Sequence, residues 1–568
     1  MKAASVSVLK SSLHRVFIGI ALLLVLIACS SSDNNPLNNG PVPNPYLSSS
    51  LYAVTHFDSS QSDSTPHGPP SGVFTVDATT RPICYGGPIN IITLASTDPN
   101  YMWQVGTDRV SYMRKDSGQW TRVAKYEALA DATGNALPAI PDDNFRAFGE
   151  STAVGMDTTS MDTYLKSLFG TNYDMRFGSG SYVLVDKDNV LYTNYGNTLY
   201  GIVLSDPNNP SAGITVRYKM GNMVATIQGT SPAPPPGTRL FGLAMTYDGH
   251  LIITFSNGVA VIDRDLNVAS KSFYRFPDTE YVSNSIAVDE KNGIYVASGG
   301  SSIASVGVMR KLVWTGTALS DSENDGAWSS PYDSSGAELP PVIKFGNGTG
   351  STPTLMGFGN DADKLVVITD GAKQMKLVAL WRDKIPEGFV QKPGTASRRI
   401  AGQIQVTCGF ATLPEWIQSE QSVVVFKYGA FVVNNIPQTV DPAFQSANRI
   451  LAVSLMGPAY PTSYGAELFQ WDSLAHEWHS AWTRSDVSST SMVPCHSQSG
   501  NMALINGYRP SYGWEVLGLD WRTGNTVHQT IFGNKNSGNG AYAVLQYLDN
   551  NDLLFNSFAG PIRIHYGN

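Results

Sequence analysis

One pattern of apolar and polar positions recurs along most of the chain. A short apolar stretch is followed by a polar turn, a second apolar stretch and then a small or polar residue. The turns are built largely from Asp, Asn and Gly, which tolerate the positive φ that tight hairpins require. Hairpins of this kind are predicted to begin at Tyr182, Leu243, Ser285, Thr354, Ser422, Met492 and Ala543.

A weaker pair of apolar stretches follows the hairpins, for example TLYGIVLSD from Thr198 and GVAVIDRDLNVAS from Gly258. Four antiparallel strands repeated many times along a chain are typical of a β-propeller. We therefore expect an all-β propeller of eight four-stranded antiparallel blades, with seven blades as the alternative. Residues 89–127 are expected to form a degenerate extra blade, and Leu51–Phe57 to close the ring as an outer strand. One helix is predicted, from Ser160.

The amino terminus has the layout of a secretory signal peptide. Residues 1–15 contain three cations and no acids, and residues 16–28 are an apolar run of 13. Such a run is too short to span a bilayer as a helix but suits the apolar region of a signal peptide. The sequence Leu26-Ile27-Ala28-Cys29 resembles the lipobox of bacterial lipoproteins. That resemblance implies cleavage before Cys29 and attachment of diacylglycerol to its thiol, with palmitate as an attached fatty acid; an ordinary secreted protein is the alternative.

The residue after this cysteine bears on location. Ser30 stands where lipoproteins retained at the inner membrane tend to carry Asp, so the resemblance implies a lipid-anchored protein of the outer membrane. We expect a signal peptide over 1–28, a lipidated flexible tether over 29–46, and a single propeller domain over 47–568 closed by its N- and C-terminal strands. The tether is rich in Ser, Asn and Pro and has little to bury.

Composition narrows the choice of partners. The chain of 568 residues has 38 Lys and Arg against 46 Asp and Glu, a net charge of −8. This acidic balance excludes the basic surface that nucleic-acid binding requires. The hydrophobic content of 42% excludes an intrinsically disordered protein. The expected partners are the membrane, through the anchor, and an envelope protein or a glycan.

Polar residues flank several of the predicted inner strands. Asp370, Glu420, Asn284 and Asn434 are expected to converge at the mouth of the central channel. Carboxylate and amide oxygens suit a hard cation, so Ca²⁺ is the cofactor that this set would bind. Turn formation is the alternative role for these residue types.

Two further groups could carry chemistry or stabilise the fold. A Cys408–Cys495 disulfide is predicted because both residues fall near neighbouring blades, with buried thiols as the alternative. In the polar segment THFDSSQSDST, His56 and Asp58 are candidates for acid–base chemistry or for capping a buried loop.

Two segments resemble known propeller repeats. SNSIAVDEKNGIYVASGG, from Ser283, resembles repeats of calcium-dependent lactonase propellers of the gluconolactonase and strictosidine-synthase-like group. WEVLGLDWRTGNTVHQT, from Trp514, is similar to the repeat of quinoprotein-type propellers, a likeness that supports the fold more than an activity. The adjacent cysteine pair common in quinone-dependent dehydrogenases is absent from the sequence.

The sequence does not decide whether the chain is an enzyme. The expected function is an envelope-anchored propeller that serves as a binding or scaffold module. A Ca²⁺-dependent hydrolase or lactonase is one alternative, and a quinoprotein-like oxidoreductase is the other.

Overall fold

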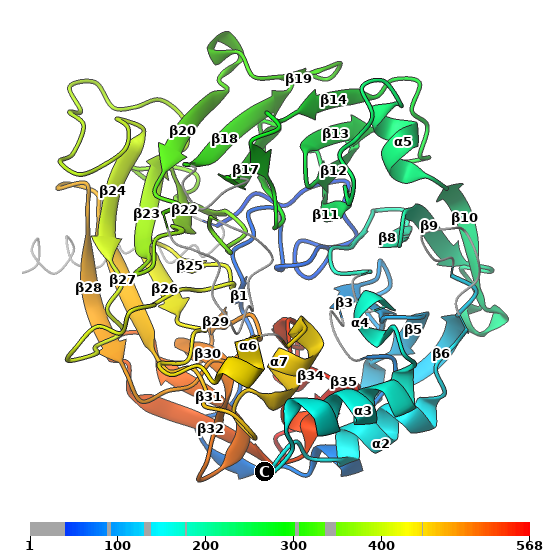
Figure 1. The fold of residues 1–568 in the computed structure, drawn as a ribbon. Helices are drawn as coiled ribbons and strands as arrows, with labels where there is room; N and C mark the ends of the chain where they lie inside the picture. Colours follow the sequence, from blue (N-terminus) through cyan, green and yellow to red (C-terminus); the bar gives the residue numbers. More distant parts are fainter. Residues whose placement is uncertain are drawn as a thin grey trace, which may run out of the picture.

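The computed structural model describes residues 40–87, 92–129, 138–176, 179–300, 306–335, 348–445 and 447–567. Within these ranges the strands form eight sheets that stand side by side around a ring (Figure 1). The predicted all-β propeller is therefore confirmed. The expected signal peptide, Cys29 and most of the tether lie outside the described residues.

The first four sheets follow one another along the chain. In each of them the strand that comes first in the sequence lies nearest the ring axis. Sheet 1 contains β3 (Ile92–Ala95), β4 (Tyr101–Val105), β5 (Val110–Arg114) and β6 (Thr121–Tyr126). Sheet 2 contains β7 (Leu184–Val185), β8 (Leu191–Tyr195), β9 (Thr198–Leu204) and β10 (Ile214–Met220). Sheet 3 contains β11 (Leu240–Met245), β12 (Leu251–Phe255), β13 (Gly258–Ile262) and β14 (Ser272–Arg275). Sheet 4 contains β15 (Glu280–Tyr281), β16 (Ala287–Val288), β17 (Gly293–Gly300), β18 (Gly307–Trp314), β19 (Leu319–Ser320) and β20 (Trp328–Tyr332).

The remaining four sheets complete the ring, and sheet 7 also takes in two strands from the N-terminal region. Sheet 5 contains β21 (Thr354–Met356), β22 (Leu365–Thr369), β23 (Lys376–Trp381) and β24 (Ile400–Gln405). Sheet 6 contains β25 (Val424–Phe426), β26 (Gly429–Val433), β27 (Ala466–Asp472) and β28 (Glu477–Arg484). Sheet 7 contains β1 (Ser64–Thr65), β29 (Cys495–Ser497), β30 (Met502–Arg509), β31 (Gly513–Asp520), β32 (Thr526–Gly533) and β2 (Gly72–Thr75). Sheet 8 contains β33 (Leu545–Tyr547), β34 (Leu553–Ser557) and β35 (Gly560–Ile564).

The seven predicted hairpins are the two inner strands of sheets 2 to 8, and the expected degenerate blade is the complete sheet 1. The turns of these hairpins show why the pattern of apolar and polar positions recurs. In sheet 4, Asp289 Oδ1 accepts hydrogen bonds from the backbone N–H groups of Lys291 and Gly293, at 2.9 and 2.8 Å. Tyr295 on the following strand donates its hydroxyl to Asp289 Oδ2 at 2.6 Å. Sheet 2 repeats this turn around Asp186, so the acidic turn residue stabilises the hairpin.

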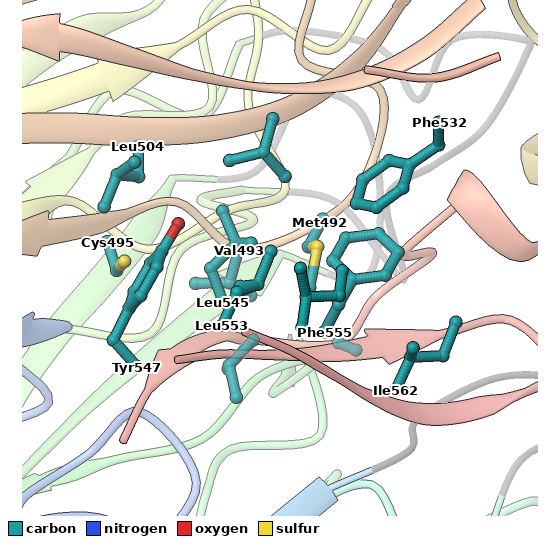
Figure 2. Packing of buried hydrophobic residues seen from close by; sticks show 14 of the residues in the cluster. Met492, Val493, Cys495, Leu504, Phe532, Leu545, Tyr547, Leu553, Phe555 and Ile562 are labelled. Carbon is teal, nitrogen blue, oxygen red and sulfur yellow. The ribbon is translucent and has the colours of Figure 1, made fainter. Parts of the chain in front are cut away.

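Between each pair of neighbouring described sheets lies one cluster of buried apolar side chains. Figure 2 shows the cluster between sheets 7 and 8, where Met492, Leu504 and Phe532 pack with Leu545 and Phe555. Each sheet is apolar on both faces because each face meets a neighbour. The core is thus divided around the ring, and every cluster depends on two segments that are distant in sequence.

The predicted Cys408–Cys495 disulfide does not form. Both residues are free, buried thiols. Cys495 lies in β29 within the cluster of Figure 2, whereas Cys408 follows β24 and packs between sheets 5 and 6. The prediction was wrong because one cysteine follows an outer strand and the other begins an inner strand two sheets further along.

The chain's two ends do close the ring, but through a different segment from Leu51–Phe57. Ile83 pairs antiparallel with Ile562 of β35, and Cys84 N–H donates to the Pro561 carbonyl at 3.1 Å. The adjoining sheets 8 and 1 are joined by the Trp120 indole N–H, which donates to the Pro561 carbonyl at 3.0 Å. Residues 82–84 therefore lie along the outer edge of sheet 8, where the sequence placed Leu51–Phe57.

Residues 44–65 instead fill the ring axis, and we call this segment the N-terminal plug (Figure 1, blue). Nearly all of its side chains from residue 52 onward are buried. It forms hydrogen bonds with every one of the eight described sheets. The protein groups involved are the Ala95, Val185, Val288, Leu355, Val425 and His496 N–H groups and the Met245 and Tyr547 carbonyls.

The described helices are inserted between strands and belong to none of the sheets, and several of them cover one sector of the ring. They are α2 (Asp142–Glu150), α3 (Thr158–Phe169), α4 (Tyr173–Arg176), α5 (Met223–Gln228), α6 (Pro442–Gln445) and α7 (Arg449–Leu455). α3 is the helix predicted from Ser160; Asp157 caps it by accepting a hydrogen bond from the Ser160 N–H at 2.7 Å. α2, α3 and α7 share an apolar cluster with Phe558 beside sheets 7 and 8 (Figure 1). Among the described residues, no helix has the length and apolar character needed to span a bilayer.

Candidate functional site

Two recesses lie on the ring axis, one on each side of the N-terminal plug. The larger, which we call the cup, is lined by residues at or just after the ends of inner strands, such as Ser96, Phe426 and Leu548. The smaller, which we call the axial cavity, is lined by residues just before or at the starts of inner strands, such as Tyr182, Asn284 and Ser422. Because they lie at opposite ends of the inner strands, the two recesses open toward opposite faces of the ring.

The cup is a depression of about 980 Å³. Its floor is formed by the plug, which contributes Asp58, Ser62 and Ser64. Aromatic rings and hydroxyl groups share its walls. The lining includes Ser48, Ser49, Ser50, Ser96, Thr97, Tyr101, Phe358, Phe426, His67, Lys115, Lys427 and Asp549.

Two of the aromatic rings in the cup are held by stacking. The Tyr101 ring stacks on Tyr112, with centroids 5.0 Å apart and planes 10° from parallel. The Phe426 ring stacks on His496 in the same way, at 4.2 Å and 24°. Flat rings fixed in this way present apolar faces to a ligand without losing conformational entropy when it binds.

The axial cavity has a volume of about 60 Å³, room for a few water molecules or for the end of a larger molecule. Titratable and amide side chains meet in it with apolar ones. Its lining includes Thr55, His56, Tyr182, Arg239, Leu240, Phe241, Asn284, Glu420, Gln421, Ser422, Val493, Tyr542 and Val544.

His56, which lines the axial cavity, forms a buried pair with Asp63. The His56 Nδ1 atom lies 2.9 and 3.1 Å from the two carboxylate oxygens of Asp63. The Asp63 side chain is fully buried and that of His56 is 6% exposed. Burial raises the pKa of Asp63 above its ordinary value, while the contact with His56 opposes that shift.

The backbone of both residues of this pair is strained. His56 and Asp63 both have positive φ, 64° and 51°, and Phe57 follows at 78°. Residues other than glycine rarely adopt this region, and they do so where the surrounding structure fixes them. The hydrogen bonds of the plug to the surrounding sheets supply that constraint.

Asn284 connects the cavity wall to two neighbouring loops. Its Oδ1 accepts hydrogen bonds from the Tyr182 hydroxyl and, at 2.7 Å, from the Thr352 hydroxyl. Its amide donates to the Gly350 carbonyl. Burial and the nearby Glu420 carboxylate raise the pKa of Tyr182, so this phenol stays protonated.

The structure brings together only two of the four expected Ca²⁺ ligands. Asn284 and Glu420 both line the axial cavity. Asp370 instead accepts the backbone N–H groups of Ala372 and Lys376, at 3.2 and 2.8 Å, and pairs with the Lys376 ammonium. The Asn434 Oδ1 atom likewise accepts hydrogen bonds from the backbone N–H groups of Gln418 and Ile436. The predicted four-residue Ca²⁺ site was wrong because the side-chain oxygens of Asp370 and Asn434 accept backbone hydrogen bonds in turns and loops.

Among the described residues, no group of three or more His, Cys, Asp or Glu side chains is arranged to hold a metal ion. Glu420 is the one carboxylate among the described residues that line the cavity, whereas a Ca²⁺ site normally uses more than one. The donor set in the cavity therefore does not fit the expected cation.

The structure separates the two residues that the sequence grouped in THFDSSQSDST. Asp58 lies on the cup side, where it accepts hydrogen bonds from the Ser60 N–H at 2.8 Å and from the Ser62 hydroxyl. His56 lies on the cavity side with Asp63 as its partner. Asp63 was not among the residues predicted from the sequence, although it stands in the same polar segment seven residues after His56.

Comparison with known proteins adds little to this picture. No protein-family model matches the chain. An uncharacterised protein of Archaeoglobus fulgidus is 30% identical over 305 residues, which are 51% of this chain and 54% of that protein. The chain thus spans about half the length of this curated relative.

Two solved structures are similar in outline. A europium-containing methanol dehydrogenase has a TM-score of 0.49 at 8% identity, with 89% of this chain and 88% of that chain covered. A quinohemoprotein alcohol dehydrogenase of Pseudomonas putida HK5 has a TM-score of 0.47 at 12% identity, with 89% and 75% covered. At such scores neither likeness bears on ligand or activity. The chain's own sheets define its class: a β-propeller whose channel is filled by its N-terminal segment.

Proposed function

We propose that this protein is a lipid-anchored binding module of the outer membrane whose ligand lies in the cup. The anchor would be the acylated Cys29 inferred from the lipobox resemblance. The observation that carries the binding function is the plug, because it turns an open channel into a blind depression of about 980 Å³. Ligand sites of proteins typically measure about 300–1,000 Å³.

The lining of the cup favours a polyhydroxylated ligand, and we propose a glycan. Serine and threonine hydroxyls both donate and accept hydrogen bonds, as sugar hydroxyls do. The fixed rings of Tyr101 and Phe426 offer faces for the apolar side of a sugar ring. Lys115 and Asp549 lie at the cup with their charged atoms 3.5 Å apart, so the two charges largely offset each other.

The tether would leave the ring on the cup side. Gly40 and Pro41, the first residues that the structure describes, line the cup. An anchor that precedes them would therefore place the cup on the side of the ring nearest the membrane. This arrangement suits a ligand that is itself part of the envelope.

The geometry gives less support to the two enzymatic alternatives. The Ca²⁺-dependent hydrolase loses two of its four expected ligands to turns. A quinone cofactor would have to occupy the cup, because the axial cavity of about 60 Å³ is several-fold below the usual size of a cofactor site.

Filling the cup tests the proposal. Ser50 is exposed and lines the cup, so we expect Ser50→Trp to occupy ligand space without disturbing a buried contact. Binding to a panel of bacterial envelope oligosaccharides, measured by calorimetry, should weaken about tenfold or more, which is about 1.4 kcal/mol. The matched control is Val390→Trp, which adds the same ring at a site 78% exposed outside the cup. Equal binding by both variants, or binding of an envelope protein instead of any oligosaccharide, would contradict a glycan in the cup.

A further inference from the structure

We propose that His56, positioned by Asp63, acts as a general base in the axial cavity and hydrolyses small carboxylic esters or lactones. This activity is independent of the cup and uses the opposite side of the plug. It rests on the geometry of the pair, on a comparison with the other buried histidines, and on the chemistry of the cavity wall.

The contact with Asp63 determines which nitrogen of His56 is available. Nδ1 faces both oxygens of a fully buried carboxylate, at 2.9 and 3.1 Å. In the neutral imidazole this places the proton on Nδ1, where it is donated to Asp63. Nε2 then carries a lone pair, and among the described residues it has no hydrogen-bond partner. Because the ring lines the cavity, this lone pair is the atom that a bound molecule can reach.

Two other buried histidines show what a structural role looks like in this protein. His528 uses both nitrogens, on the Pro70 carbonyl and the Thr530 hydroxyl, at 2.7 and 2.8 Å. His496 contacts the Ser64 hydroxyl through Nδ1, and its Nε2 is buried without a partner beside the rings of Phe426 and Trp521. Neither contacts a carboxylate and neither lines the axial cavity. His56 alone among these three combines an acidic partner with an open nitrogen.

The position of Ser422 makes water the nucleophile. Its hydroxyl lies 3.4 Å from His56 Nδ1, on the side already occupied by Asp63. A serine activated by this histidine would have to contact Nε2 instead. The cavity has room for water, so His56 acts on a water molecule held at Nε2.

The walls of the cavity indicate the class of substrate. Leu240, Phe241 and Val544 supply apolar surface for an acyl or alkyl group. Glu420 is the one carboxylate among the described lining residues, whereas glycoside hydrolysis uses two. The small volume limits what enters to the reacting end of a compact molecule. An ester or lactone carbonyl meets these conditions and requires a single proton acceptor.

The reaction balances with water as the only co-reactant. A water proton moves to His56 Nε2 while the water oxygen forms a bond to the carbonyl carbon. The bond from that carbon to the alkoxy oxygen then breaks, and the imidazolium returns its proton to the departing oxygen. The products are a carboxylic acid and an alcohol, joined in one molecule when the substrate is a lactone. Asp63 stays charged and stabilises the imidazolium.

Chemical modification tests the open nitrogen directly in the full-length protein. Diethyl pyrocarbonate acylates unprotonated imidazole nitrogens, and peptide mass spectrometry locates each label. We expect His56 to react together with His479, whose side chain is 56% exposed, while His496 and His528 remain unlabelled. Asp63→Asn should slow labelling of His56 about tenfold. Failure of His56 to react under conditions that label His479 would overturn the proposal.

An activity assay tests the chemistry. Hydrolysis of p-nitrophenyl acetate and γ-butyrolactone is measured for wild type, His56→Gln and Asp63→Asn. We expect kcat to fall about 100-fold in both variants, with KM nearly unchanged for Asp63→Asn because Asp63 is a positioning residue. The matched control is His496→Gln, at a buried histidine outside the cavity. Hydrolysis absent from wild type or unaffected by the two variants overturns general-base catalysis, and loss of activity in Ser422→Ala overturns the assignment of water as nucleophile.

Discussion

At the scale of single residues, the polar side chains most easily mistaken for a site in this sequence are turn formers. Asp370 accepts the backbone N–H groups of Ala372 and Lys376 just after it, and Asn434 accepts those of Ile436 and of the more distant Gln418. Asp289 does the same in sheet 4. The residue types that ligate cations are also those that complete tight turns, because both tasks require exposed oxygen lone pairs close to the backbone. Residue type at the end of a strand therefore could not separate the two roles here.

The buried histidines make the stability of the protein depend on pH. Burial lowers the pKa of His496 to about 3 and that of His528 to about 4, whereas an unfolded histidine titrates near ~6.5. As the pH falls below ~6.5, the unfolded chain binds protons that the folded chain does not. The free energy of unfolding should then decrease by up to about 1.4 kcal/mol per pH unit for each histidine.

Replacement of both histidines isolates this effect. The double variant His496→Gln, His528→Gln should show a shallower loss of stability than wild type between about pH 6.5 and about pH 4, measured by urea unfolding. The difference between the two proteins removes the contribution of groups that titrate in both. Identical slopes would mean that the folded protein accepts these protons.

At the scale of elements, the repeated hairpins could be predicted from the sequence, whereas the plug, which does not repeat, could not. The inner hairpins were visible because apolar alternation and Asp–Asn–Gly turns recur in each, so a local signal was reinforced seven times. The plug has no such periodicity. Its conformation depends on hydrogen bonds to strands hundreds of residues away, such as that from the Tyr52 hydroxyl to the Tyr547 carbonyl at 2.8 Å. The pairing of His56 with Asp63, rather than proximity to Asp58, depends on the same long-range contacts.

Removal of the plug should strongly destabilise the ring. Inner-strand N–H groups such as those of Val288 and Leu355 donate to plug carbonyls at 2.7 and 3.0 Å, and each net hydrogen bond contributes about 0.5–1.5 kcal/mol. Buried Tyr52 and Phe57 add apolar contacts. A chain that begins at Pro66 should therefore unfold at a markedly lower temperature than one that begins at Gly40.

A peptide supplied in trans provides the control for this truncation. A synthetic peptide of residues 44–65 should restore much of the lost thermal stability, and a scrambled peptide of the same composition should not. Equal melting temperatures for the two chains would show that the plug does not stabilise the ring.

At the scale of the whole molecule, the ring is held by contacts between its first and last sheets. The buried Arg563 pairs with Asp552 at 2.7 Å within sheet 8 and donates to the Gln119 carbonyl of the sheet 1 region at 2.6 Å. Thr93 and Gln546 join the inner strands of the same two sheets, with the Gln546 amide 3.0 Å from the Thr93 carbonyl. Closure of the ring could be predicted from the number of repeats. The segment that completes sheet 8 could not, because residues 82–84 are too few to show an apolar alternation.

Membrane attachment through the proposed anchor and oligosaccharide binding by the ring should be independent of each other. With Cys29→Ser, expressed in a Gram-negative host, we expect the protein to move from the membrane fraction to the soluble fraction, because the variant lacks the thiol proposed to receive the lipid. Oligosaccharide binding by the released protein should equal that of wild type. Retention of the variant in membranes after salt washing would show that something other than an acyl chain holds the protein there.

The plug also makes the ring a partition. Asp58 and Ser62 face one solution and His56 faces the other, yet they belong to one continuous run of seven residues. Along the axis of the described ring, the plug lies between the two recesses. A molecule bound in one recess can therefore influence the other through the short peptide segment that lines both.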